Sequence, residues 1–85
     1  MTYNHRMDFT TPTPQAVLAA RQAAGHTQAQ AAKAVGLGSH VRWSEYERDG
    51  APTSRQMDAA RWQLYLLLTD QHPAFRLAKR RVSKA

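Results

Sequence analysis

The sequence predicts an all-α fold, a compact domain of four to five short helices. Two observations lead to this prediction. Helix-capping signals recur along the chain, and the apolar residues that follow each signal are spaced as on one face of a helix. The chain has 85 residues, the size of one small domain, and a domain of this size buries little apolar surface. A second subunit would supply the burial that such a chain lacks.

The first helix is predicted from its two ends. Thr13 is a capping residue followed by Pro14, which suits the first helical position, and Gly25 suits a left-handed stop. We therefore expect a helix over 14–24. Residues 1–12 show no clear helical period, and we interpret them as a flexible N-terminal arm.

The second helix begins at a capping box. Thr27 and Gln30 are spaced so that each side chain bonds to the other residue's backbone N–H. A helix over 28–35 and a tight turn at 36–38 follow from this start and from the glycines of the turn. The residues expected to be buried are Ala31, Ala32 and Val35.

Two further helices are predicted downstream. The third covers 39–47, where Trp43 and Tyr46 are three residues apart and share a face. The fourth is expected to start at a second capping box, Thr53-x-x-Gln56, and to run to about Thr69. Its inward stripe is predicted to hold Met57, Ala60, Leu64 and Leu67 or Leu68.

The fourth helix carries a second apolar line that a monomer of this size could hardly cover, so we assign it to the interface of a homodimer. The predicted interface residues are Trp62, Tyr65, Leu66, Thr69 and Phe75. The folded domain is expected to span 13–70, followed by a basic C-terminal tail over 71–85. In that tail Phe75, Ala78 and Val82 have the spacing of a short fifth helix.

The helices over 28–35 and 39–47, joined by a short turn, have the arrangement of a helix-turn-helix. Such a pair can place its second helix in the major groove of DNA, about 12 Å wide, while the first crosses the phosphate backbone. Across about residues 15–69 the sequence resembles the helix-turn-helix family of phage Cro and lambda-type (XRE-type) repressors. The resemblance is carried by Arg21, Gln28, Ala32, Gly36, Trp43, Tyr46, Glu47 and Gly50.

The resemblance implies a sequence-specific regulator of transcription that binds double-stranded DNA, as a dimeric repressor of an inverted-repeat operator in a small phage-type operon. The short apolar runs and the lack of a signal-peptide pattern lead us to expect a cytoplasmic protein. It also implies that Gln28 contacts phosphate and that Arg21 pairs with Glu47 beneath the recognition helix. Residues 56–77 resemble small prophage regulators, among them autoregulators that accompany anti-CRISPR genes. The segment from Gly36 to Glu47 is one residue longer than the family pattern, which leaves the facing of its first residues open.

Base contacts are expected from the outward side of the helix over 39–47. Arg42 is the main candidate because its guanidinium can donate two hydrogen bonds to O6 and N7 of guanine. Glu45 has three open interpretations: a bond from cytosine N4, repulsion of phosphate, or simple solvation. Ser39 and His40 can read bases, bind phosphate or cap the helix. The complete set is Arg42, Ser39, His40, Ser44 and Glu45.

Phosphate contacts are expected near the helix starts and at the rim of the motif. Thr27 and Gln28 lie at a helix N-terminus, where N–H groups favour anions, and the capping box alone also explains them. Lys33 fits simple solvation equally well. The predicted phosphate-binding set is Thr27, Gln28, Lys33, Arg48 and Arg55.

The net charge of +6 and the pI near 10.6 indicate an acidic partner, most often nucleic acid. Five of the twelve basic residues follow Asp70, however, so the charge excess points to the tail rather than to the motif. The basic residues of that tail can bind phosphates or be simply solvated.

Other chemistry is not expected. The four histidines lack the spacing of a metal site, Ser39 and His40 diverge as helix neighbours, and a glycine-rich phosphate loop is missing. We therefore expect neither an enzyme nor a bound metal or cofactor. The longest apolar run, 64–68, is far shorter than the roughly 20 residues of a membrane span. The alternative class is a protein-interaction module such as an antitoxin, anchored through Trp62 and Tyr65.

Overall fold

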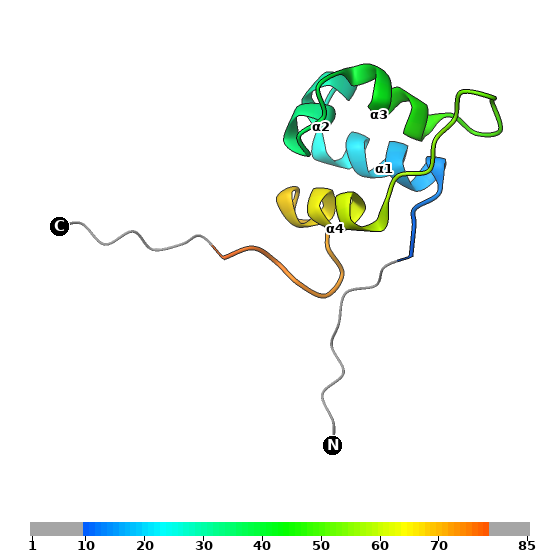
Figure 1. The fold of residues 1–85 in the computed structure, drawn as a ribbon. Coiled ribbons are helices and arrows are strands. Elements are labelled where there is room, and N and C mark those ends of the chain that lie inside the picture. The colour runs from blue at the N-terminus through cyan, green and yellow to red at the C-terminus, as the bar shows by residue number, and fades with distance from the viewer. Residues whose placement is uncertain (1–9, 79–85) are drawn as a thin grey trace.

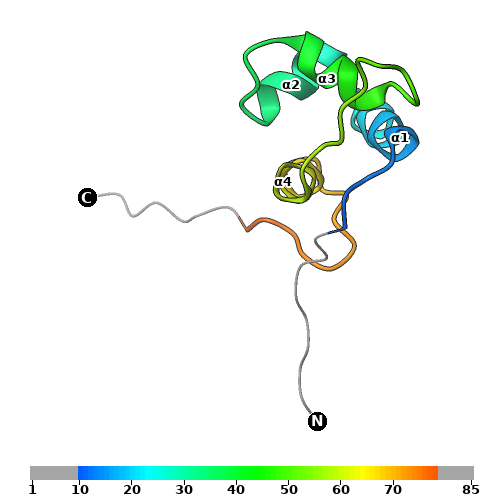
Figure 2. The same cartoon turned by 45° about the vertical axis from the view of Figure 1, so that its right-hand side comes forward.

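Residues 10–78 are described by the computed structural model of the protein, and this part of the chain holds four α-helices and no strand. The helices are α1 (Pro14–Ala24), α2 (Gln28–Ala34), α3 (His40–Glu47) and α4 (Ala59–Leu68) (Figure 1). The predicted all-α class is confirmed. α3 packs against α1 and α2, and α2 also contacts α4. In both ribbon views α2 and α3 form the upper layer and α4 the lower one, with α1 between these levels (Figures 1 and 2).

The first two helices have the caps that the sequence indicates. The Thr13 hydroxyl accepts a hydrogen bond from the N–H of Ala16 at 3.1 Å, and Gly25 ends α1 with φ at 72°. In the capping box of α2, the Thr27 hydroxyl accepts from Gln30 N at 3.1 Å and Gln30 Oε1 accepts from Thr27 N at 2.8 Å. These bonds satisfy N–H groups that a helix start otherwise leaves without partners.

The core forms where all four helices meet, around two aromatic rings. Trp43 of α3 and Tyr65 of α4 are both fully buried, with ring centroids 4.8 Å apart. The Tyr65 hydroxyl lies 2.9 Å from Nδ1 of His26, so the phenol is buried without losing its hydrogen bond. Val17 of α1 and Met57, just before α4, are also buried here. These contacts hold α3 against the rest of the domain.

The fourth helix starts later than the sequence suggests, and the predicted capping box at Thr53 and Gln56 is wrong. The Thr53 hydroxyl accepts a hydrogen bond from Nη1 of Arg48 at 2.6 Å, while Gln56 Nε2 donates to the Pro12 carbonyl at 2.5 Å. Asp58 caps α4 instead, accepting from Arg61 N at 3.0 Å. Because Pro12 is buried and hydrogen-bonded, it belongs to the packed domain rather than to the arm; residues 1–9 lie outside the described part.

The inward face of α4 also differs from the prediction. Tyr65 and Leu66, assigned to a subunit interface, are buried in the protein's own core. Ala60 and Leu64, expected inside, are exposed, and of the two alternatives for the last inward position Leu67 is partly buried and Leu68 is 46% exposed. The aromatic contact between Tyr65 and Trp43 sets this register, since the larger ring fills the space between the helices. The assignment of Tyr65 and Leu66 to a dimer interface is therefore wrong.

The other three predicted interface residues are partly buried. Trp62 packs against the core, and the Thr69 hydroxyl donates to the Tyr65 carbonyl at 2.8 Å. Phe75 lies beside the ring of His72, at a centroid distance of 5.4 Å. These contacts are made within one chain, and the role of the three residues in a subunit interface stays a prediction.

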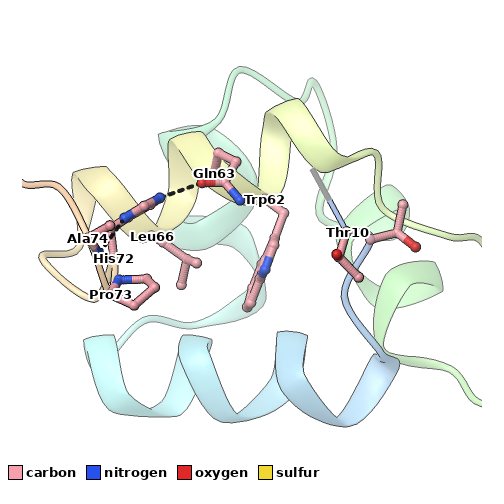
Figure 3. Close-up of a pocket in the computed structure, with 8 residues that line it drawn as sticks. Thr10, Trp62, Gln63, Leu66, His72, Pro73 and Ala74 are labelled. Atoms are coloured by element: carbon pink, nitrogen blue, oxygen red, sulfur yellow. Dashed lines mark hydrogen bonds between the residues drawn. The ribbon is translucent and has the colours of Figure 1, made fainter. Parts of the chain in front are cut away.

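The expected fifth helix is absent from residues 71–78; Val82, its last predicted apolar residue, lies outside the described range. Nδ1 of His72 accepts hydrogen bonds from the N–H groups of Ala74 and Phe75, both at 3.0 Å, and so caps a turn. With Nδ1 an acceptor, Nε2 must carry the ring proton, which it donates to Gln63 Oε1 (Figure 3). The side chain of His72 thus competes with helix formation for these N–H groups.

Candidate nucleic-acid interface

The turn between α2 and α3 is fixed by backbone hydrogen bonds. Leu37 N donates to the Ala32 carbonyl at 2.9 Å, and Gly36 N donates to the Lys33 carbonyl at 3.1 Å, the pair of bonds of a Schellman motif. Gly36 has φ at 78°, a conformation that costs glycine little and other residues more. Ser39 then caps α3, its hydroxyl accepting from Val41 N at 3.0 Å. The turn is therefore closed at one end by the Schellman motif of α2 and at the other by the Ser39 cap of α3.

The inner face of α3 is devoted to packing. Trp43 and Tyr46 are buried, with ring centroids 6.3 Å apart. Trp43 Nε1 donates to Glu47 Oε2 at 2.5 Å, one turn further along the helix. Glu47 Oε1 also accepts from Gln28 Nε2 at 3.0 Å, which ties α3 to the first turn of α2.

Arg21 and Glu47, the expected structural pair, meet through two hydrogen bonds. Arg21 Nε donates to Oε2 at 2.6 Å and Nη2 donates to Oε1 at 3.1 Å, while Nη1 reaches the His26 carbonyl at 3.1 Å. Burial alone would raise the pKa of Glu47, but the bonds from Arg21, Gln28 and Trp43 and the charge of Arg21 lower this pKa below its ordinary value. The bond to Glu47 raises the pKa of Arg21. Both groups are therefore held in their charged forms.

The outer side of α3 carries most of the residues predicted to contact bases. Ser39, His40 and Arg42 are exposed, and Ser44 is partly exposed with its hydroxyl donating to the Val41 carbonyl at 2.7 Å. Val41 is 49% exposed on the same side. Sequence reasoning left the facing of Val41 open and did not include it among the contacts. The spacing could have indicated that Val41 is exposed, because Val41 lies two residues before the buried Trp43 and therefore on the opposite face of the helix.

Glu45 is less exposed than the sequence suggests and is paired with two arginines. Its Oε1 lies 3.2 Å from Arg42 Nε and 3.0 Å from Arg55 Nε, and its side chain is 19% exposed. The interpretation of Glu45 as a simply solvated residue is therefore wrong. Both partners were singled out from the sequence as DNA contacts, but the pattern gave no sign that one carboxylate would join them, because Arg55 comes from the segment after α3.

The predicted phosphate contacts are spread over several segments. Gln28 and Thr27 use their side chains within the protein, on Glu47 and on the capping box respectively. Lys33 is exposed and lines a shallow hollow with Ser39 and His40, at the junction of α2 and α3. Arg48 is exposed and donates to the Thr53 hydroxyl. Their contacts with phosphate stay predictions.

A separate pocket of about 260 Å³ lies beside α4, away from the outer face of α3. Trp62, Leu66 and Pro73 form its apolar wall, and Gln63, His72 and Thr10 line its polar part (Figure 3). The Gln63 and His72 side chains are hydrogen-bonded to each other. The pocket therefore belongs to the packing of the segment that follows α4.

Comparison of the chain with protein-family models, with curated proteins and with solved structures finds no match. Within residues 10–78 none of the helices has the length and apolar character needed to cross a membrane. The same part of the chain contains no group of three histidine, aspartate or glutamate residues placed to hold a metal ion.

Proposed function

We propose that the protein is a sequence-specific regulator of transcription that binds double-stranded DNA. In this proposal α2 and α3 act as a helix-turn-helix, with α3 in the major groove and α2 across the phosphate backbone. The observation that carries it is the division of α3 into two faces. Trp43, Tyr46 and Glu47 commit the inner face to the core, while Val41 and Arg42 project from the outer side.

The exposed side chains of α3 suit the chemistry of base edges. Arg42 can donate two hydrogen bonds to O6 and N7 of guanine, a contact worth about 1–3 kcal/mol of discrimination. Val41 offers methyl groups to the 5-methyl of thymine. Ser39 and His40 are at the start of α3 and Arg48 is just after its end. In the proposed complex these residues would contact the phosphates that flank the groove.

We further propose that two copies bind an inverted repeat through α4. Ala60, Leu64 and Leu68 are exposed and four residues apart, so they form one apolar line on that helix. A dimer would cover this line and place the two copies of α3 about 34 Å apart, in successive major grooves. The simplest regulatory outcome is repression, because a protein bound across a promoter excludes others from it.

The test is selection of bound fragments from a random duplex library by the full chain. We expect an inverted repeat to be enriched. The Arg42→Ala variant should lose the preference while keeping part of its nonspecific binding, since phosphate contacts are independent of sequence.

Arg61→Ala is the matched control for Arg42→Ala. Arg61 pairs with Asp58 three residues earlier, as Arg42 pairs with Glu45 three residues later, but it lies on α4. We expect this control to enrich the same site as the unaltered protein. Failure of the unaltered chain to enrich any duplex would overturn the proposed function, and an unchanged preference in Arg42→Ala would overturn the role of Arg42.

A further inference from the structure

We infer that Glu45 is a positioning residue that determines DNA specificity in two ways. It orients Arg42 toward a base edge, and it weakens the sequence-independent attraction of Arg42 and Arg55 to phosphate. The inference rests on the proposed DNA-binding function. It adds that the Glu45 carboxylate affects specificity without itself contacting a base.

The geometry at Glu45 differs from that of an ordinary surface ion pair. One oxygen, Oε1, lies 3.2 Å from Arg42 Nε and 3.0 Å from Arg55 Nε, so a single carboxylate oxygen forms ion pairs with arginines of α3 and of the segment before α4. The backbone N–H of Arg55 also donates to the Glu45 carbonyl at 3.0 Å, so Glu45 and Arg55 are linked through both backbone and side chain. The arginine side chains are 46% and 56% exposed, against 19% for Glu45. The carboxylate thus lies beneath two guanidinium groups that remain open to solvent.

This arrangement leaves the Nη groups of Arg42 available for hydrogen bonds to a base. A guanidinium has five N–H donors, and Glu45 engages Arg42 through Nε. The Nη groups therefore remain for the paired acceptors of guanine, while the contact at Nε limits the directions that they can take.

The same carboxylate reduces attraction to the DNA backbone. Glu45 offsets one of the two positive charges at this position and itself repels phosphate. Attraction to phosphate is independent of sequence, so a loss of that attraction weakens binding to every duplex, whereas the orientation of Arg42 benefits only the correct site. Glu45 therefore increases the ratio of specific to nonspecific affinity.

The test compares Glu45→Gln with Asp49→Asn in the full chain. Both variants remove one negative charge, and Asp49 lies two residues after the end of α3 with its carboxylate accepting from Gln15 Nε2 at 2.8 Å. The affinity for the selected site and for an unrelated duplex of equal length is measured between 50 and 200 mM salt, a range over which phosphate contacts change affinity strongly.

We expect Glu45→Gln to bind the unrelated duplex more tightly, with a salt slope steeper by about 0.9, the value for one added phosphate contact. Its ratio of specific to nonspecific affinity should fall by about tenfold, the equivalent of one base contact. Asp49→Asn should strengthen binding to both duplexes alike and leave the ratio unchanged. Glu45→Asp, which keeps the charge but withdraws the carboxylate by one methylene, should lower the ratio without the gain in nonspecific binding.

Four outcomes would overturn the inference. Equal ratios in Glu45→Gln and Asp49→Asn would mean that only charge matters. A loss confined to one C·G pair, additive with Arg42→Ala, would mean that Glu45 accepts from cytosine itself. A chain without any preferred site would overturn the proposed function together with this inference, whereas a clear preference that survives Glu45→Gln would overturn this inference alone.

Discussion

Arg21 and Glu47 form a bidentate ion pair that joins α1 to the last residue of α3, with Nε 2.6 Å from Oε2 and Nη2 3.1 Å from Oε1. Their side chains are only 18% and 9% exposed. Because Trp43 and Gln28 bond to the same carboxylate, the pair is the centre of a network that fixes α3 against α1 and α2.

Replacement of Arg21 by alanine should lower the free energy of unfolding by about 3 kcal/mol, since it leaves the Glu47 carboxylate charged and largely buried. Urea unfolding followed by circular dichroism measures the loss. Arg21→Lys keeps the charge but cannot form the bidentate contact, so its free energy of unfolding should lie between those of Arg21→Ala and the native protein. Arg61→Ala, which breaks a pair whose side chains are 32% and 55% exposed, should cost at most about 0.5 kcal/mol. Equal losses for Arg21→Ala and Arg61→Ala would contradict a structural role for the network.

Stability should decrease in acid partly through Glu47. Its pKa is lowered in the folded protein, so the unfolded chain takes up a proton first, at about pH 4.3, the ordinary value for glutamate. The contribution of Glu47 is therefore complete above that pH and is lost as the pH falls through the folded pKa. Glu47→Gln should be less stable than the native protein at pH 7, and the gap should narrow toward pH 3. Denaturant midpoints across this range provide the measurement, and a gap independent of pH would contradict the prediction.

The first three helices and the caps of α1 and α2 could be predicted from the sequence because these features are local. Thr13, Gly25 and the box of Thr27 and Gln30 act within one turn of their own positions. The inner face of α3 could also be predicted, since Trp43 and Tyr46 are three residues apart and so share one face of the helix.

The start and register of α4 could not be predicted, because they depend on contacts far along the chain. Thr53 and Gln56 have the spacing of a capping box, but their side chains are taken by Arg48 and by the Pro12 carbonyl. Tyr65 lies inside because it meets Trp43 and His26, neither of which is near it in sequence. The ion pairs of Glu45 with Arg42 and Arg55 could not be predicted for the same reason, since Arg55 lies outside α3. The sequence therefore indicated the residues of the candidate site but not the ion pairs among them.

The exposed line on α4 allows dimerisation to be tested separately from folding. Leu64 is 42% exposed, so Leu64→Glu should leave the thermal midpoint of the isolated chain nearly unchanged. It should raise the dissociation constant of the proposed dimer by at least about tenfold, as expected when a charge enters an apolar interface. Light scattering after size exclusion at tens of micromolar measures both species. Tyr65→Ala, in the core, should instead cost about 3–5 kcal/mol of stability. A native chain that is strictly monomeric would contradict the proposed dimer.

Val41 gives the sharpest test of which base edges α3 contacts in the proposed complex with DNA. If its exposed methyl groups contact the 5-methyl of a thymine, replacement of that thymine by deoxyuridine removes the contact and leaves base pairing intact. We expect a loss of about 0.8 kcal/mol, or about fourfold in affinity, at one thymine of each half-site. Each thymine of the selected site is replaced in turn and the affinity is measured by titration.

Val41→Ala is the matched variant, because it removes methyl groups without altering charge. Its affinity for the unmodified site should fall by a similar amount, and it should then be insensitive to deoxyuridine at the thymine in question. Non-additivity of the two changes is the diagnostic result, since a contact that is already lost cannot be lost again. If deoxyuridine weakens Val41→Ala as much as the native protein, the thymine is contacted by another residue, and the outer face of α3 meets the DNA in a different register.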